Sequence, residues 1–265
     1  MRGRSGKALA VADFAWSPVA NEVALESTSG KLWLAVAGQA ARQISPGSRR
    51  VAGPLAWSPD GTQIAYASAS QGRPSYGQLD AFTVAGQRTK SVQRLANTGF
   101  LVADWLPGNT LLYWQDPYFS SSIAADGLWI YCDVLPGNHP RRLVQTLPYP
   151  DWIAPASDGK TVAVVAGTSR ETGVNKSVAL CTGQTGQCQR TGEKSGVVPP
   201  AGAGIWDPTS DPGQSLLLYV RSHALWMFST ETWHATQITG TLAVPGGPAG
   251  QLGYYGHLAW NTEWT

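Results

Sequence analysis

The sequence has few charged residues and no long apolar run. Charged residues make up 14% of its 265 residues, where an average soluble domain has about 25%, and the net charge is only +2. Binding to nucleic acid requires a concentrated cationic surface, which this balance does not provide. The longest apolar stretches, such as 216–220, fall far short of the roughly 18 residues of a membrane span. We therefore expect neither a nucleic-acid partner nor a membrane span in this chain.

Turn-forming and aromatic residues are abundant instead. The chain has 30 Gly, 18 Pro and 12 Trp, and 43% of its residues are hydrophobic. This hydrophobic fraction with almost no net charge excludes intrinsic disorder, and so much Gly and Pro excludes a coiled coil. Arg2, Arg4 and Lys7 precede a short apolar run at 8–12, but Asp13 interrupts that run, so we do not interpret it as a signal peptide. The composition indicates a compact, loop-rich, all-β protein.

Trp residues mark an internal repeat with intervals of 41 to 54 residues. Each of them ends a short strand, and a turn usually follows. The six positions are Trp16, Trp57, Trp105, Trp152, Trp206 and Trp260. An apolar second strand is predicted at 22–27, 63–68, 110–115, 161–167 and 215–221, followed by a third strand and a short polar fourth strand. Short apolar runs bounded by Gly, Pro, Asp and Ser are typical of strands, so each repeat predicts a four-stranded sheet.

This repeat predicts an all-β fold, a β-propeller of four-stranded antiparallel blades within a single domain, 1–265. A single blade cannot cover its own two faces, so it stacks on its neighbours. The blades are expected at about 9–45, 52–96, 100–146, 150–192 and 203–240, with the first strand of a sixth at 257–265. We interpret this count as a fragment, a truncated gene or an incomplete six-bladed ring; a five-bladed ring closed by 258–264 is an alternative. A solenoid or a β-sandwich is also left open.

The segment from Ala56 to Tyr66, AWSPDGTQIAY, resembles the WSPDG signature of the WD40-like repeats in TolB-type propellers. The Leu-Trp pairs ending at Trp33, Trp129 and Trp226 resemble the third strand of that repeat. The resemblance covers nearly the whole chain and is sharp only in the second repeat. It implies a scaffold of a bacterial exported or envelope-associated protein that binds a partner, but it transfers no partner-binding residues.

Three long loops are the predicted binding surface. Antiparallel strands alternate in direction, so the tight turns lie on one face of the propeller and the second-to-third loops on the other. Loops on a rigid scaffold often carry binding residues, although insertions also accumulate wherever they are tolerated. Aromatic and Arg side chains are enriched at interface hot spots, which favours a protein or peptide partner. The candidate residues are Arg73 and Tyr76 in loop 70–78, Tyr118 and Phe119 in loop 116–126, and Arg170 in loop 168–176.

The cysteine pattern indicates a disulfide. Cys181 and Cys188 flank a predicted hairpin turn, which would place them opposite each other on antiparallel strands at a spacing close to that of a disulfide. The bond would imply an oxidising compartment, so we expect a periplasmic or extracellular protein. Two unrelated thiols in a cytosolic protein are the alternative, and Cys132 is expected to be a buried free thiol. The four His residues are scattered, so neither a metal site nor a catalytic His is predicted.

No known catalytic motif is present in the sequence. Gly-x-Ser-x-Gly, His-Glu-x-x-His and a Gly-rich phosphate loop are all missing. The pairs Asp60-Gly61 and Asp158-Gly159 are predicted to be turn residues. We therefore expect a monomeric, non-catalytic interaction protein without a cofactor. Two alternatives are a substrate-gating propeller of a prolyl-oligopeptidase-like peptidase whose catalytic domain is absent, and an extracellular sensor domain of a membrane-anchored regulator.

Most Trp residues are expected to pack between blades, not to form a binding surface. Six end the first strand of a repeat, and Trp33, Trp129 and Trp226 occupy the third strand. Only Trp114, Trp233 and Trp264 lie outside these positions.

Overall fold

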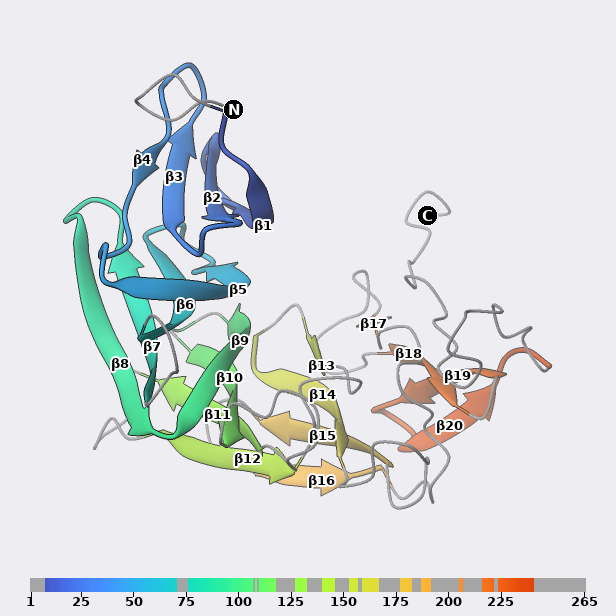
Figure 1. Cartoon of the computed structure of the whole chain (residues 1–265). Helices are drawn as coiled ribbons and strands as arrows, with labels where there is room; N and C mark the ends of the chain where they lie inside the picture. Colours follow the sequence, from blue (N-terminus) through green and yellow to red (C-terminus); the bar gives the residue numbers. More distant parts are fainter. Residues whose placement is uncertain are drawn as a thin grey trace, which may run out of the picture. The chain divides into compact units, whose positions relative to one another are not determined.

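Every regular element in the described part of the chain is a β-strand (Figure 1). The computed structural model describes residues 8–70, 76–106, 108, 110–117, 127–132, 140–145, 153–156, 159–166, 177–182, 187–191, 205–206, 216–221 and 224–240. Within this part we find no α-helix with the length and hydropathy needed to cross a bilayer.

The strands form five four-stranded sheets, which we call blades 1 to 5 in chain order. Neighbouring strands are consecutive in sequence, as in an antiparallel meander. Blade 1 has β1 (Val11–Trp16), β2 (Glu22–Ser27), β3 (Leu32–Val36) and β4 (Arg42–Gln43); blade 2 has β5 (Arg49–Trp57), β6 (Gln63–Ser70), β7 (Tyr76–Thr83) and β8 (Arg88–Ala96); blade 3 has β9 (Thr98–Leu106), β10 (Thr110–Pro117), β11 (Gly127–Cys132) and β12 (Arg141–Gln145); blade 4 has β13 (Ile153–Pro155), β14 (Thr161–Ala166), β15 (Ser177–Thr182) and β16 (Cys188–Arg190); blade 5 has β17 (Ile205–Trp206), β18 (Leu216–Arg221), β19 (Ala224–Ser229) and β20 (His234–Gln237).

The predicted fold class is confirmed by these sheets. The second strand of blade 1 is found at Glu22–Ser27 as predicted, and those of the other blades differ by at most two residues at either end. In blade 2, β5 begins at Arg49, three residues before the predicted boundary, and β6 continues to Ser70. The partial sixth blade predicted at 257–265 lies outside the described residues.

The chain divides into two compact units. One consists of Met1–Ala124 and Tyr131–His139, and the other of Ala125–Ile130 and Pro140–Thr265. The single domain expected from the sequence stays a prediction.

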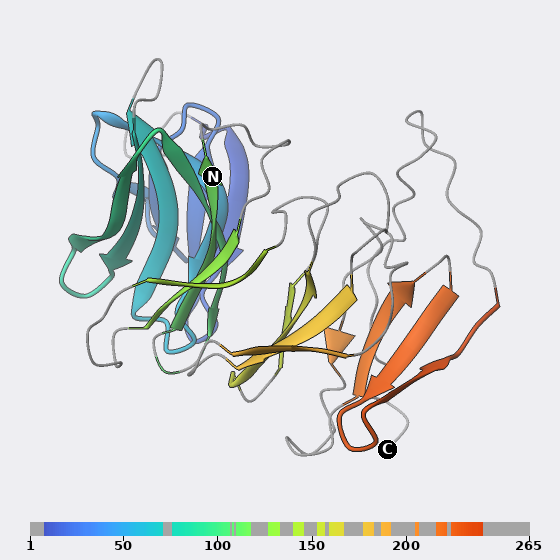
Figure 2. The ribbon, with the colours of Figure 1, turned by 90° about the horizontal axis from the view of Figure 1, so that it is seen from below.

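One core of the first unit lies between blades 1 and 2, which lie face to face in Figure 2. The Trp57 side chain is 7% exposed, and its indole Nε1 donates a hydrogen bond of 2.8 Å to the backbone oxygen of Ala15 in blade 1. Burial and this hydrogen bond together fix the two blades to each other. The buried cluster comprises Ala24, Leu32, Leu34, Val51, Leu55, Trp57, Ile64, Tyr66 and Phe82.

The prediction that all nine repeat-marking Trp residues are buried between blades is wrong for Trp16. Trp16 is 65% exposed and its neighbour Phe14 is 58% exposed, on the face of blade 1 that points away from blade 2. Trp57 occupies the same repeat position, but it has blade 1 packed against it. Trp114, which fits no repeat position, is only 8% exposed. The repeat therefore sets where a Trp points, and the neighbouring sheet sets whether it is buried.

Blades 4 and 5 share a core in the second unit. Val165 and Leu180 of blade 4 belong to one buried cluster with Tyr219 and Phe228 of blade 5. Trp226 is half-buried and packs against this cluster, whereas the indole of Trp233 is 38% exposed and meets the Phe228 ring edge-on at 5.2 Å. The blade-on-blade packing of the first unit is thus repeated here.

The turn between β5 and β6 depends on Asp60 and Gly61, as predicted. Asp60 Oδ1 accepts hydrogen bonds from Ser58 Oγ at 2.6 Å and from the backbone N of Thr62 at 3.0 Å. Gly61 has a φ of 68°, in the left-handed region, and a Cβ at this position would lie 2.2 Å from a methyl carbon of Val19 in blade 1. The turn therefore requires Gly both for its conformation and for the approach of blade 1.

The Asp60 carboxylate should make a small contribution to stability that is lost in acid. The hydrogen bond from Ser58, followed by that from the backbone of Thr62, lowers the pKa of Asp60 below its ordinary value. A lowered pKa in the folded state gives stability that is present above the ordinary pKa and lost as the pH falls through the lowered one. Asp60→Ala should therefore lower the free energy of unfolding at pH 7, by less than about 1 kcal/mol because the side chain is exposed to solvent. Urea unfolding at pH 7 and pH 2 measures this, and an equal loss at both would contradict it.

Cys181 and Cys188 form a disulfide. They are directly opposed on β15 and β16, with their Cα atoms 4.0 Å apart. Cys132, expected to be a free thiol, lies at the end of β11. Disulfides are typical of oxidising compartments, so this bond is consistent with an extracytoplasmic location.

Mass spectrometry of protein purified from its native host tests whether this bond forms there. Without reductant, digestion should yield one peptide pair joined through Cys181 and Cys188, which reductant separates. Recovery of both residues as free thiols, alkylated before reduction, would contradict an extracytoplasmic location.

Candidate functional site

Only one of the five predicted partner-binding residues lies in the described part of the chain. Tyr76 is described, while Arg73, Tyr118, Phe119 and Arg170 lie outside the described residues. The sequence predicted Tyr76 within a loop, but it is the first residue of β7. Pairing with β8 therefore holds its backbone in place at the start of β7.

Tyr76 belongs to a row of polar side chains on one face of blade 2. Tyr76, Gln78 and Asp80 alternate along β7, so they point to the same face. Gln78 pairs directly with Ser68 of β6 and with Arg94 of β8. The same face continues into the apolar core that packs on blade 1, at Tyr66 and Phe82. One end of this face is thus polar and the remainder apolar.

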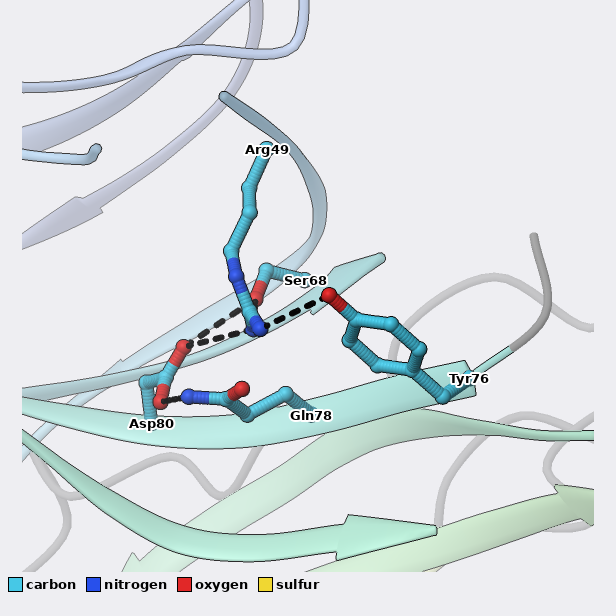
Figure 3. Close-up of polar contacts among 5 residues, drawn as sticks. All are labelled: Arg49, Ser68, Tyr76, Gln78 and Asp80. Atoms are coloured by element: carbon cyan, nitrogen blue, oxygen red, sulfur yellow. Dashed lines mark hydrogen bonds and ion pairs between the residues drawn. The ribbon is translucent and has the colours of Figure 1, made fainter. Parts of the chain in front are cut away.

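Arg49, at the start of β5, connects Tyr76 to this row (Figure 3). Its Nη2 donates to the Tyr76 hydroxyl at 3.3 Å, and its Nη1 donates to Ser68 Oγ at 3.2 Å. Nη1 also lies 4.0 Å from Asp80 Oδ2, the limit of an ion pair. Arg49 therefore holds the aromatic ring and the buried carboxylate in one network.

Arg94 of β8 stacks on the same aromatic ring. Its guanidinium carbon lies 3.8 Å from the centre of the Tyr76 ring, and that of Arg49 lies 5.3 Å from it. Both distances are within the range of a cation–π interaction. Arg94 is exposed and Tyr76 half-buried. Two cations thus lie within reach of one tyrosine ring, and one of them is exposed to solvent.

Asp80 is the internal counter-ion of this cluster. The residue is 1% exposed; its Oδ2 accepts a hydrogen bond from Ser68 Oγ at 3.0 Å, and its Oδ1 accepts one from Gln78 Nε2. Burial raises the pKa of the Asp80 carboxyl, while the hydrogen bonds from Gln78 and Ser68 and the charge of Arg49 oppose the rise. Both carboxylate oxygens have internal donors, so Asp80 organises the site and is not available to a ligand.

The cluster brings cationic and aromatic side chains together, which suits it to binding. With Asp80 ionised, two guanidinium groups and one carboxylate leave one positive charge beside an aromatic ring. Arg and Tyr are residue types that dominate binding energy at interfaces. In the described part of the chain, no three His, Cys, Asp or Glu side chains gather where they could hold a metal ion.

A second arginine–aromatic pair lies at the other end of blade 2. Arg42 of β4 lies with its guanidinium carbon 5.9 Å from the centre of the Phe82 ring, and its Nη1 donates to Gln87 Oε1 at 3.4 Å. Gln87 is in the turn between β7 and β8, whereas Tyr76 begins β7. Arg42 therefore serves as a matched control for substitutions at Arg94.

The sequence indicated Tyr76 but not its partners. Arg49, Ser68, Asp80 and Arg94 are contributed by four different strands, and only the pairing register brings them together. One signal was present: Gln78 and Asp80 are polar residues in a strand whose neighbours are apolar, which is typical of a buried polar network.

Comparisons with known proteins support the fold. The sequence matches no protein-family model and no curated protein sequence. TolB from Acinetobacter baumannii has a similar structure, with 15% sequence identity and a TM-score of 0.50, covering 86% of this chain and 54% of TolB. An oligogalacturonate lyase from Vibrio parahaemolyticus has 10% identity and a TM-score of 0.57, covering 90% of this chain and 68% of the lyase. A puromycin hydrolase mutant complexed with PGG has 17% identity and a TM-score of 0.56, covering 92% of this chain and 40% of the hydrolase.

These likenesses show the fold alone, and they correct one prediction. The chain spans about half of the A. baumannii TolB and less than half of the puromycin hydrolase. The TolB-like propeller fold inferred from the WSPDG resemblance is supported. The prediction that the chain is not an enzyme is wrong as an inference from its sequence, because a lyase and a hydrolase have similar structures and this fold does not exclude catalysis. The lack of Gly-x-Ser-x-Gly and His-Glu-x-x-His in the sequence excluded only the reactions that depend on these two motifs.

Proposed function

We propose that this chain is a TolB-like propeller of an exported or envelope-associated bacterial protein, and that it binds a protein or peptide partner at the Tyr76 end of blade 2. One observation carries the proposal: two guanidinium groups lie within cation–π distance of a half-buried tyrosine at the start of β7. Rigid strands position this cluster, so a partner would meet a preformed surface at little entropic cost. The Cys181–Cys188 disulfide supports the exported location.

Selection from a random peptide library displayed on phage tests the binding surface. Peptides selected on the immobilised chain should bind the wild type and Arg42→Ala equally, and should lose at least about tenfold in affinity on Tyr76→Ala and Arg94→Ala. Unfolding curves of all variants confirm that the fold is retained. Selected peptides that bind all four proteins equally, or a selection that yields none, would contradict the proposed surface.

A second candidate function is the substrate-gating propeller of a larger hydrolase, such as a prolyl-oligopeptidase-like peptidase. The likeness to puromycin hydrolase supports it, since it covers 92% of this chain and only 40% of the hydrolase. The uninterrupted reading frame on both sides of these residues is the test. A flanking domain with Gly-x-Ser-x-Gly and a later His would favour the hydrolase, and flanking sequence without a catalytic domain would contradict it.

A further inference from the structure

Arg94 is the part of the Tyr76 cluster that is free to meet a ligand. It is exposed, and within the described residues no carboxylate lies within ion-pair distance of it. Stacking at 3.8 Å places its guanidinium against the tyrosine ring and limits its motion. The N–H donors of a guanidinium lie in the plane of the group. When its flat face contacts an aromatic ring, these donors remain available at its edge. Two parallel N–H groups there match the two oxygens of a carboxylate.

Arg49 adds charge, and two of its five N–H donors are used within the cluster. Its Nη2 is used by the Tyr76 hydroxyl, and its Nη1 by Ser68 beside Asp80. It therefore contributes a fixed positive potential close to Arg94, which draws an anion toward the same end of the blade.

From this arrangement we infer that the cluster binds an acidic peptide, one of whose carboxylates is held by the edge of the Arg94 guanidinium beside Tyr76. The inference rests on the proposed function and names the chemistry of its ligand. The single positive charge of Arg94 matches the single negative charge of a carboxylate. A phosphate dianion would require a second positive charge. An acidic saccharide is disfavoured, because sugar rings stack on open aromatic faces and Arg94 covers a face of Tyr76.

The test compares two blocked peptides, one of alternating Glu and Gly and the other of alternating Gln and Gly. Binding to the full chain is followed by NMR, through the Nε–Hε signals of its arginines. We expect the Glu peptide to bind at least about tenfold more tightly than the Gln peptide, since charge-assisted hydrogen bonds are roughly twice as strong as neutral ones. This preference should weaken in higher salt.

Three variants locate the effect. Arg94→Gln should reduce the preference below about threefold, and Arg42→Gln, the matched control, should leave it unchanged. Asp80→Asn should strengthen binding about threefold, because it removes the counter-ion of Arg49 while an amide can still form hydrogen bonds with Ser68 and Gln78.

Each remaining outcome contradicts the inference. Equal binding of the two peptides, or a preference that survives Arg94→Gln, would overturn it. Binding of trigalacturonate without binding of the Glu peptide would assign the site to a saccharide instead. If the phage selection yields neutral peptides that depend on Tyr76, the proposed function stands and only the acidic ligand is wrong.

Discussion

Replacing Trp57 with Ala should lower the free energy of unfolding by about 3–5 kcal/mol. The side chain is 7% exposed between blades 1 and 2, so its removal leaves a large cavity in the core of the first unit. The variant also loses the hydrogen bond from the indole to the Ala15 oxygen. Trp57→Phe, which keeps most of the volume, should cost less, and part of its cost, about 1 kcal/mol, reflects that hydrogen bond. Urea unfolding at constant m-value measures both losses.

Trp16→Ala is the matched control, since both residues occupy the same position of the repeat. Trp16 is 65% exposed, and substitutions at exposed positions usually change stability by less than about 1 kcal/mol. Similar losses at the two positions would show that Trp16 is also buried in solution, and that the difference between the two blades is wrong.

The strands could be predicted from the sequence because their signals are local. The turn residues Asp60 and Gly61 and the apolar run after them determine where β6 begins, and an apolar second strand recurs in each blade. The exposure of Trp16 could not be predicted in this way. The repeat gives the side chains of Trp16 and Trp57 the same orientation within their blades. Whether each is buried depends on what packs against that face of the blade, and no local sequence pattern specifies this packing.

The site was predicted in part, for a related reason. Tyr76 was found because the sequence predicts a loop at 70–78 that contains an aromatic residue. Ser68 and Arg94 were missed because their proximity to Tyr76 depends on the register of β7 with β6 and β8. A one-residue shift in register would place these side chains on opposite faces of the sheet. The polar network is therefore a property of strand pairing, and residue types alone do not indicate it.

The two carboxylates of blade 2 should respond to pH in opposite directions. The pKa of Asp60 is lowered by its hydrogen bonds, so its contribution to stability is lost in acid. The pKa of Asp80 is raised by burial, so its contribution is fully present in acid and is lost as the pH rises through the raised value. At neutral pH the charge on Asp80 is therefore a cost, which its hydrogen-bond donors limit.

Removing one of those donors should increase the cost of the Asp80 charge to the stability of the fold. Ser68→Ala should lower the free energy of unfolding at pH 7 by about 1.5–3 kcal/mol, because Ser68 Oγ donates to the buried Asp80 carboxylate and accepts from Arg49. The loss should shrink as the pH falls toward 4, because protonation of Asp80 removes the charge that the hydroxyl stabilises. Urea unfolding at several pH values between 4 and 7 measures both effects.

Ser70→Ala is the matched control for Ser68→Ala, because Ser70 lies two residues further along β6 and on the same face. Ser70 Oγ is buried, and among the described residues it has no hydrogen-bond partner, so its removal should leave stability unchanged or raise it at every pH. Asp80→Asn provides the second control, since in that background Ser68→Ala no longer removes a donor to a charge and its cost should no longer vary with pH. A loss on Ser68→Ala that is the same at pH 4 and pH 7 would mean that the hydroxyl acts through packing and not through the Asp80 carboxylate. The electrostatic description of the whole cluster, including the role of Asp80 as counter-ion to Arg49, would then be wrong.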